Sequence, residues 1–106
     1  MNISKKMQDA FNTQIVAEMW SSNLYLQMSC WFRKEGWKGF SSWMYKQAEE
    51  ERQHAMDMAQ FVLHRGGEVI LTSIDAVKTS WTDAKEAFVD TFAHEQKVTE
   101  LINKLA

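Results

Sequence analysis

A chain of 106 residues with a formal net charge of −2 is long enough for one domain with a modest hydrophobic core. This charge, and the lack of any cluster of Lys and Arg, leaves no electrostatic basis for nucleic-acid binding. Because no apolar run reaches membrane-spanning length and no secretion signal opens the chain, we expect a cytoplasmic protein with no membrane partner.

The first predicted helix covers residues 4–34, with Ser4 as its N-cap and Gly36 as a left-handed stop. Cys30 lies on this helix among many apolar residues. As the single cysteine of the chain, it excludes an internal disulfide and suits a reducing compartment. We expect it to be a small core residue and not a nucleophile.

The inward face of this helix is marked by residues at alternating spacings of three and four, which are Phe11, Gln14, Glu18, Ser21, Tyr25, Met28 and Phe32. Glu18 interrupts this line near its middle. Because Gln14 and Ser21 are polar as well, a helix rotated to place Glu18 in water stays open as an alternative.

The second predicted helix covers residues 40–65, between a tight turn that ends at Gly39 and the pair Gly66-Gly67. The short turn makes the first two helices antiparallel neighbours. The inward line of the second helix is Phe40, Met44, Gln47, Glu51, His54, Met58 and Phe61. At its centre is a Glu-x-x-His pair, whose two side chains share one helix face and can reach one ion. A buried carboxylate needs compensation, and a metal ion is the simplest.

Residues 66–82 show no helical period, and in extended form they span roughly 55 Å at ~3.3 Å per residue. The second helix is about 39 Å long at ~1.5 Å per residue. The crossover can therefore run the full length of the bundle and let a third helix lie parallel to the second. Asp83 and Glu86 predict a capping box that opens this third helix, over residues 83–106. Its inward line is Phe88, Thr91, Glu95, Val98, Ile102 and Leu105.

If the three helices pack together, Glu18, Glu51, His54 and Glu95 meet at one depth of the bundle. Three crowded carboxylates repel one another and force at least one of them to keep its proton, whereas two divalent cations neutralise the cluster. A lone Glu-x-x-His pair occurs by chance in many exposed helices. Three coincident interruptions of an apolar face instead predict a shared metal site.

Four stretches of the chain strongly resemble bacterial non-haem ferritin, of the ferritin-like di-iron family. They are Ala17–Leu26 (AEMWSSNLYL), Glu50–Met56 (EERQHAM), Arg65–Gly67 and His94–Val98 (HEQKV). The resemblance runs along the whole chain but covers only the first three helices of the family, so we expect a ferritin truncated after its third helix. It implies an all-α, ferritin-like four-helix bundle with a long crossover, of which helices one to three are present.

The resemblance also implies a set of metal ligands. Glu18 would be the terminal carboxylate ligand of a first iron, and His54 the imidazole ligand of the same ion. Glu51 would bridge both irons, and Glu95 would be a ligand of the second. In the family, the remaining ligands of the second iron come from the fourth helix.

Two further residues have both a functional and a structural interpretation. Glu50 resembles a ligand of an extra inner iron position, and a solvated helix face beside Glu49 explains it equally well. Tyr25 resembles a tyrosine that hydrogen-bonds the site and supplies an electron, and a core aromatic with a satisfied hydroxyl is the equal alternative. Haem-binding relatives carry a methionine directly after the bridging glutamate. Arg52 occupies that position here, so no haem is expected.

The function implied by the resemblance is iron storage with ferroxidase activity. Such a protein oxidises Fe(II) with dioxygen at a di-iron centre and stores hydrous ferric oxide in a shell of its own copies, 24 in the intact family member. The alternatives are a related di-iron peroxide-scavenging enzyme and a helical association module with an incomplete metal site. Because three helices expose a long apolar groove, chains that complete each other's bundle are a further alternative to truncation.

Overall fold

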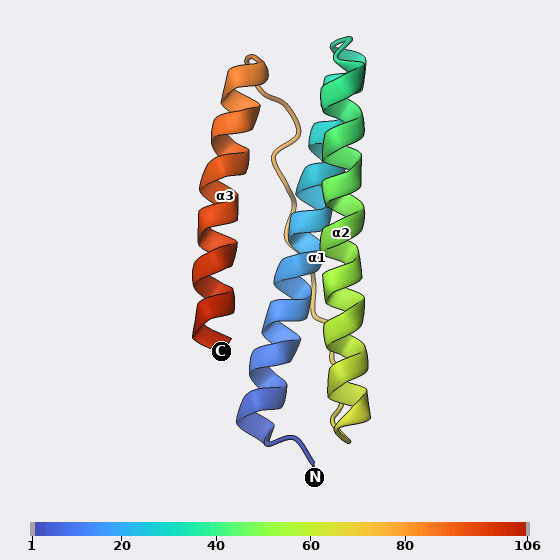
Figure 1. The fold of residues 1–106 in the computed structure, drawn as a ribbon, viewed down its shortest axis with the longest axis vertical. Coiled ribbons are helices and arrows are strands. Elements are labelled where there is room, and N and C mark those ends of the chain that lie inside the picture. Colours follow the sequence, from blue (N-terminus) through green and yellow to red (C-terminus); the bar gives the residue numbers. More distant parts are fainter. Residues whose placement is uncertain (1, 106) are drawn as a thin grey trace.

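The computed structural model describes the backbone of residues 2–105 and the side chains of residues 2–97. It has three helices, α1 (Lys5–Lys34), α2 (Lys38–His64) and α3 (Ala84–Leu105), and measures 51 × 21 × 20 Å (Figure 1). No strand occurs in the part of the chain that is described, which confirms the predicted all-α class. None of the described helices combines the length and the apolar character needed to cross a membrane.

The start of α1 is capped as the sequence predicted. The Ser4 hydroxyl oxygen accepts a hydrogen bond from the N–H of Met7 at 3.1 Å. This bond satisfies one of the four N–H groups that have no partner within the first turn of a helix. The cap fixes where α1 begins, and with it the register of every inward side chain further along.

The turn between α1 and α2 is tighter than the sequence suggested. Gly36 has a φ of +90°, a left-handed conformation that side chains rarely adopt, so the chain reverses there as predicted. The carbonyl of Trp37 then accepts from the N–H of Ser41 at 2.9 Å and closes the first turn of α2. α2 consequently begins at Lys38, two residues before the predicted start, and ends at His64.

The core lies between α1, α2 and the start of α3. Its buried members are Leu24, Tyr25, Met28, Phe32, Met44, Ala48, Trp81 and Ala87. Ser29 and Ser41 allow α1 and α2 to approach closely, because each hydroxyl donates to the carbonyl oxygen of the other residue, at 2.7 and 2.8 Å. Cys30 is exposed, so the expectation of a core cysteine is wrong. Its neighbour Ser29 occupies the inward position on that turn of the helix.

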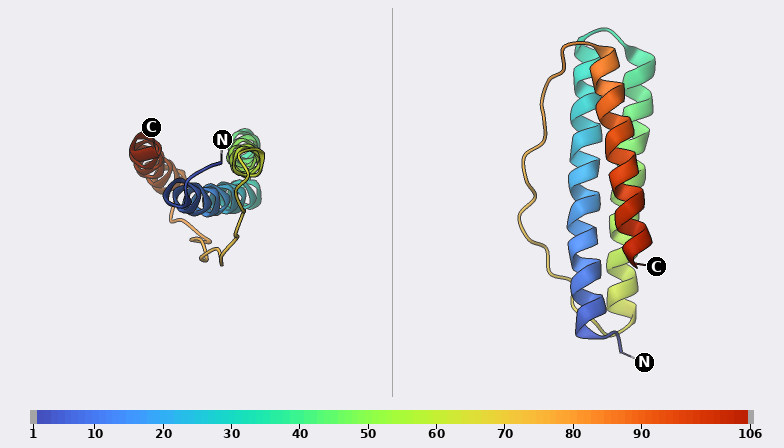
Figure 2. Two further views of the ribbon diagram at one scale, coloured as in Figure 1. Left: turned by 90° about the horizontal axis from the view of Figure 1, so that it is seen from below. Right: turned by 90° about the vertical axis from the view of Figure 1, so that its left-hand side faces the viewer.

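The crossover, residues 66–82, runs back along the outside of α1 (Figure 2, right). The side chain of Asn12 binds the backbone of the first part of the crossover, as donor and as acceptor. The side-chain amide of Asn12 donates to the carbonyl of Glu68 at 2.9 Å, and its oxygen accepts from the N–H of Ile70 at 3.0 Å. Because the crossover returns to the end of the bundle where α2 began, α3 lies parallel to α2, as predicted (Figure 1).

The first turn of α3 forms only half of the predicted capping box. Asp83 accepts through Oδ1 from the N–H of Glu86 at 2.9 Å. The Glu86 carboxylate does not return the bond to the backbone of Asp83. It accepts instead from Lys78 at 2.7 Å and from the hydroxyl of Thr82. These contacts tie the end of the crossover to α3.

Seen end-on, α1 lies between α2 and α3 (Figure 2, left). α3 packs on α1 through Phe88, whose ring centroid is 5.5 Å from that of Phe32, and through Thr91, whose hydroxyl is 3.3 Å from the sulfur of Met28. The side of α2 that faces away from α1 is less covered. Phe61 packs on α1 as predicted, with its ring centroid 5.0 Å from that of Phe11, but 39% of it is exposed.

Candidate metal centre

Glu18 is fully buried halfway along α1, so the alternative of a rotated helix is wrong. Its two carboxylate oxygens are in different situations. Oε1 accepts a hydrogen bond from Nε2 of Gln14 at 3.0 Å, whereas Oε2 is buried and has no hydrogen-bond partner among the described residues. One oxygen of Glu18 is therefore held by a residue of α1, and the other is available to bind a ligand.

Glu51 and His54 face Glu18 from α2. Glu51 is 6% exposed, and its Oε2 atom, like that of Glu18, is buried without a partner. Nδ1 of His54 lies 3.6 Å from Oε2 of Glu51 and 3.8 Å from Oε2 of Glu18. The side chain of His54 is 54% exposed, so the group is closed by buried carboxylates on one side and open at the imidazole.

Among the described residues, no lysine or arginine forms an ion pair with Glu18 or Glu51. The pKa of Glu51 is raised to about 9, with burial as the largest cause, and the adjacent carboxylate of Glu18 and the negative charges of Glu95 and Glu50 act in the same direction. Glu51 therefore keeps its proton at neutral pH as long as no cation is present. A bound cation would supply the missing positive charge and displace that proton.

The donor set fits a divalent metal ion. One ligand atom from each of Glu18, Glu51 and His54 can be chosen so that all three lie within 4.8 Å of one another. Ligand atoms that bind one ion at about 2.1 Å lie at most about 4.2 Å apart, so the two separations from His54 already satisfy this limit. Two carboxylate oxygens and one imidazole nitrogen suit Fe(II), Zn(II) or Mn(II) better than Cu(I) or an iron–sulfur cluster.

Tyr25 and Glu95 meet beside this cluster. Tyr25 is fully buried on α1, and its hydroxyl donates to Oε1 of Glu95 on α3. Burial raises the pKa of Tyr25, and the hydrogen bond and charge of Glu95 raise it further, so the phenol stays protonated. Its hydroxyl is thus satisfied, and by a predicted metal ligand, which is compatible with both interpretations of this tyrosine.

Two predicted ligands lie outside the three-residue group. Glu95 is close enough for its charge to raise the pKa of Glu51, but it is not one of the residues within 4.8 Å. Glu50 is exposed on the neighbouring face of α2, and its charge acts on Glu51 in the same way. The structure therefore gathers Glu18, Glu51 and His54 tightly and places the other two acids around them.

Sequence reasoning missed the polar contact that joins α3 to α1 at this depth. Nε2 of His94 lies 2.7 Å from the hydroxyl oxygen of Ser21, and that hydroxyl donates its proton to the carbonyl of Ala17 at 3.0 Å. A hydroxyl has one proton, so Nε2 of His94 is the donor to Ser21 in the tautomer that goes with the bond from Ser21 to Ala17. Burial lowers the pKa of His94, which favours the neutral ring. The signal available in the sequence was the polar Ser21 on an inward line.

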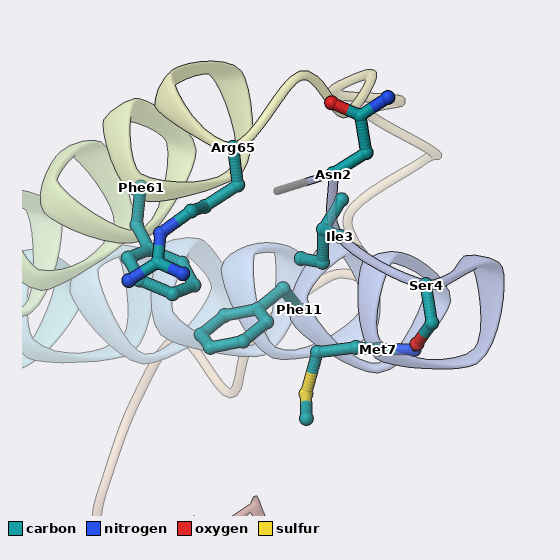
Figure 3. Close-up of a pocket in the computed structure, with 7 residues that line it drawn as sticks. All are labelled: Asn2, Ile3, Ser4, Met7, Phe11, Phe61 and Arg65. Atoms are coloured by element: carbon teal, nitrogen blue, oxygen red, sulfur yellow. The ribbon is translucent and has the colours of Figure 1, made fainter.

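A separate pocket of about 300 Å³ lies near the amino terminus and shares no residue with the carboxylate cluster. It is lined by Asn2, Ile3, Ser4, Met7, Phe11, Phe61 and Arg65. The rings of Phe11 and Phe61 lie 5.0 Å apart at its wall, and the guanidinium of Arg65 stacks on Phe61 at 5.0 Å (Figure 3). The pocket contains no group of predicted metal ligands.

Comparison with known proteins gives consistent matches. The model of the ferritin-like domain family matches residues 8–106. A bacterial non-heme ferritin of Bacteroides fragilis is 50% identical over 103 residues, which are 97% of this chain and 65% of that protein. A probable bacterial non-heme ferritin-like protein of Haemophilus influenzae is 32% identical, with 62% of its length covered. The chain thus spans less than two thirds of the relatives it matches.

Solved structures give the same result for the fold. The open pore ferritin of the archaeon Archaeoglobus fulgidus superposes with a TM-score of 0.94 at 45% identity, over 97% of this chain and 63% of that one. A closed form engineered from that ferritin gives a TM-score of 0.95 at 44% identity.

Proposed function

The chain belongs to the ferritin-like family, and we propose that it binds Fe(II), oxidises it with dioxygen and stores it as hydrous ferric oxide in a homo-oligomeric shell. The observation that carries this proposal is the pair of buried, unpartnered oxygens, Oε2 of Glu18 and Oε2 of Glu51, facing Nδ1 of His54. A buried carboxyl oxygen without a hydrogen-bond partner is costly whether the group is charged or neutral, and binding of a cation substrate removes that cost.

The proposed role of the three-residue group is capture of the first Fe(II). His54 provides an imidazole nitrogen, which suits Fe(II), at the exposed edge of the group. Glu18 and Glu51 provide hard carboxylate oxygens, which favour the higher charge of Fe(III) after oxidation. Glu51 gives up its proton when Fe(II) binds, so the acid that is neutral without a cation becomes a charged ligand.

The proposed role of Glu51 and Glu95 is to hold a second Fe(II) beside the first. Two Fe(II) ions each give up one electron, so dioxygen receives two electrons and, with two protons, leaves as hydrogen peroxide. Tyr25 holds Glu95 by its hydroxyl and thereby limits the motion of that ligand. Exposed Glu50 is suited to receive Fe(III) on its way from the site.

The oligomeric shell, the cytoplasmic location and the partners of the protein are part of the same proposal. Family membership and the similarity to bacterial ferritins support them. The chain covers 65% of the length of the Bacteroides relative. Any ligands of the second iron other than Glu51 and Glu95 are therefore also part of the proposal. The expected shell of 24 copies has a mass in the range of hundreds of kilodaltons, which light scattering measures directly.

Anaerobic titration of the chain with Fe(II), followed by oxygen, tests the proposal. Saturable binding of about two ions per bundle and an oxygen-dependent ferric colour are the expected results. Rapid consumption of hydrogen peroxide without mineral would point to the peroxide-scavenging alternative. Binding no stronger than that of exposed carboxylates would leave a helical association module, and the proposed function would be wrong.

A further inference from the structure

Gln14 is a buried polar residue one helical turn before Glu18 on α1. It is 4% exposed, and its side-chain amide donates to Oε1 of the fully buried Glu18 at 3.0 Å. A hydrogen bond to a carboxylate in such surroundings is roughly twice as strong as one between neutral groups. Its position on the inward line of α1 would otherwise suit an apolar side chain.

The hydrogen bond from Gln14 makes the two oxygens of Glu18 inequivalent. Oε1 is occupied by the amide, and Oε2 points to the cluster with no partner. Among the described residues, the buried side-chain nitrogens and oxygens that lack a partner are Oε2 of Glu18 and Oε2 of Glu51. Each of the two buried carboxylates therefore presents one oxygen to the position between them.

We propose that Gln14 is a positioning residue that makes Glu18 bind a divalent cation through Oε2 alone. With Oε1 held by the amide, Glu18 cannot rotate to chelate the ion with both oxygens unless that hydrogen bond breaks. Binding through one oxygen leaves a coordination position of the ion open for other ligands. This inference rests on the proposed function, because it assumes that the cluster binds a cation.

The chemistry of the amide explains why glutamine suits this position. Its N–H group is a donor without charge, so it orients the carboxylate and leaves its negative charge for the cation. A lysine would neutralise Glu18 and compete with the metal, and an apolar side chain would leave Oε1 free to bind the ion. Groups that orient a metal ligand in this way typically change metal affinity 10–100-fold when they are removed.

The test is a titration of the 106-residue chain with Co²⁺, whose visible absorption reports coordination number, alongside the variants Gln14→Met and Gln27→Met. Methionine keeps the length of the side chain and removes the donor. Gln27 lies on α1, farther from the cluster, and receives the same substitution. We expect roughly tenfold weaker binding and an altered absorption band for Gln14→Met. Gln27→Met should match the unsubstituted chain.

The outcomes separate this inference from the proposed function. Equal affinity within twofold and an unchanged Co²⁺ band in a normally melting Gln14→Met variant overturn the positioning role and leave the proposed function standing. Failure of the unsubstituted chain to bind Co²⁺ more tightly than a Glu51→Ala variant overturns both. Loss of affinity with an altered band supports the inference, because a purely structural defect would weaken binding without changing the coordination of what is bound.

A second measurement needs no variant and covers the case in which Gln14→Met does not fold. The side-chain amide protons of Gln14 can be followed by NMR in the unsubstituted chain before and after addition of Zn²⁺. Slow hydrogen exchange that persists in the Zn²⁺-bound form supports the role of Gln14. Exchange at the rate of a free amide after Zn²⁺ binds overturns it, because the bond to Glu18 would then have broken.

Discussion

Nδ1 of His54 lies 3.8 Å from Oε2 of Glu18, across the interface between α1 and α2. The same nitrogen lies 3.6 Å from Oε2 of Glu51, one turn away on its own helix. Packing of two antiparallel helices thus builds a three-ligand group before α3 contributes anything. The relative placement of the three ligands depends on how α1 packs on α2. Farther along the same interface, the hydroxyls of Ser29 and Ser41 also join the two helices.

Replacing Glu51 by alanine should abolish fast oxidation of Fe(II). Glu51 provides one of the two unpartnered oxygens and is the proposed bridge, so we expect the initial rate to fall by at least the 10–100-fold typical for loss of a metal's supporting residues. The rate is measured by the rise of ferric absorbance after mixing with oxygenated buffer. Glu49→Ala, on the exposed face of α2, is the control, and unchanged rates in Glu51→Ala would refute the bridging role.

The same residue should make the stability of the cation-free chain depend on pH. Folding raises the pKa of Glu51 from 4.5 to about 9, so between these values the folded state binds a proton that the unfolded state has lost. The free energy of unfolding is therefore highest below pH 4.5, as far as Glu51 is concerned, and falls as pH rises toward 9. Urea unfolding at several pH values measures this slope.

The matched control for that measurement is Glu51→Gln, which keeps the shape of the side chain and removes its titration. This variant should show a flatter dependence on pH and, above neutral pH, a more stable cation-free fold than the unsubstituted chain. A slope of the opposite sign, or an identical slope in Glu51→Gln, would show that other groups dominate the pH dependence.

The contact between Ser21 and His94 should stabilise the attachment of α3 to α1. Ser21→Ala removes the acceptor of the 2.7 Å bond from the half-buried His94, at a cost of about 1–3 kcal/mol if the imidazole N–H stays unsatisfied. We expect faster hydrogen exchange of backbone amides in α3 and little change in α2. Thr13→Ala, whose exposed hydroxyl bonds only to the carbonyl of Asp9 on the same helix in the contacts described, is the control. Uniform acceleration in both helices would contradict a local role.

The sequence was sufficient to predict the helices and the acids at their centres, because apolar spacing and capping residues act locally. Ser4 and Gly36 both occupy the predicted places. Which side of each helix is covered depends on distant partners, and here the prediction was weaker. Phe61 was expected to point inward, and its ring does pack on Phe11 of α1, but it is 39% exposed where it lines the pocket near the amino terminus.

The candidate site was predicted only in part, because local patterns place residues on a helix but do not place one helix against another. Glu18, Glu51 and His54 share two adjacent helices whose register the short turn fixes, so their meeting could be anticipated. The role of Gln14 could not be anticipated, because a polar residue on an inward line is equally compatible with a rotated helix. The bond between Ser21 and His94 depends on how α3 is placed by a crossover without periodic structure, and no local pattern encodes that.

Binding of a redox-inert cation should release about one proton per ion at pH 7. Without a cation Glu51 is protonated, since burial and the charge of Glu18 raise its pKa to about 9, and it must lose this proton to become a ligand. Zn²⁺ is the suitable probe, because it suits the same carboxylate and imidazole ligands and does not react with oxygen. Calorimetric titrations in buffers of different ionisation enthalpy give the number of protons released. Glu51→Gln should release close to none, whereas equal release by both proteins would show that the proton comes from another group.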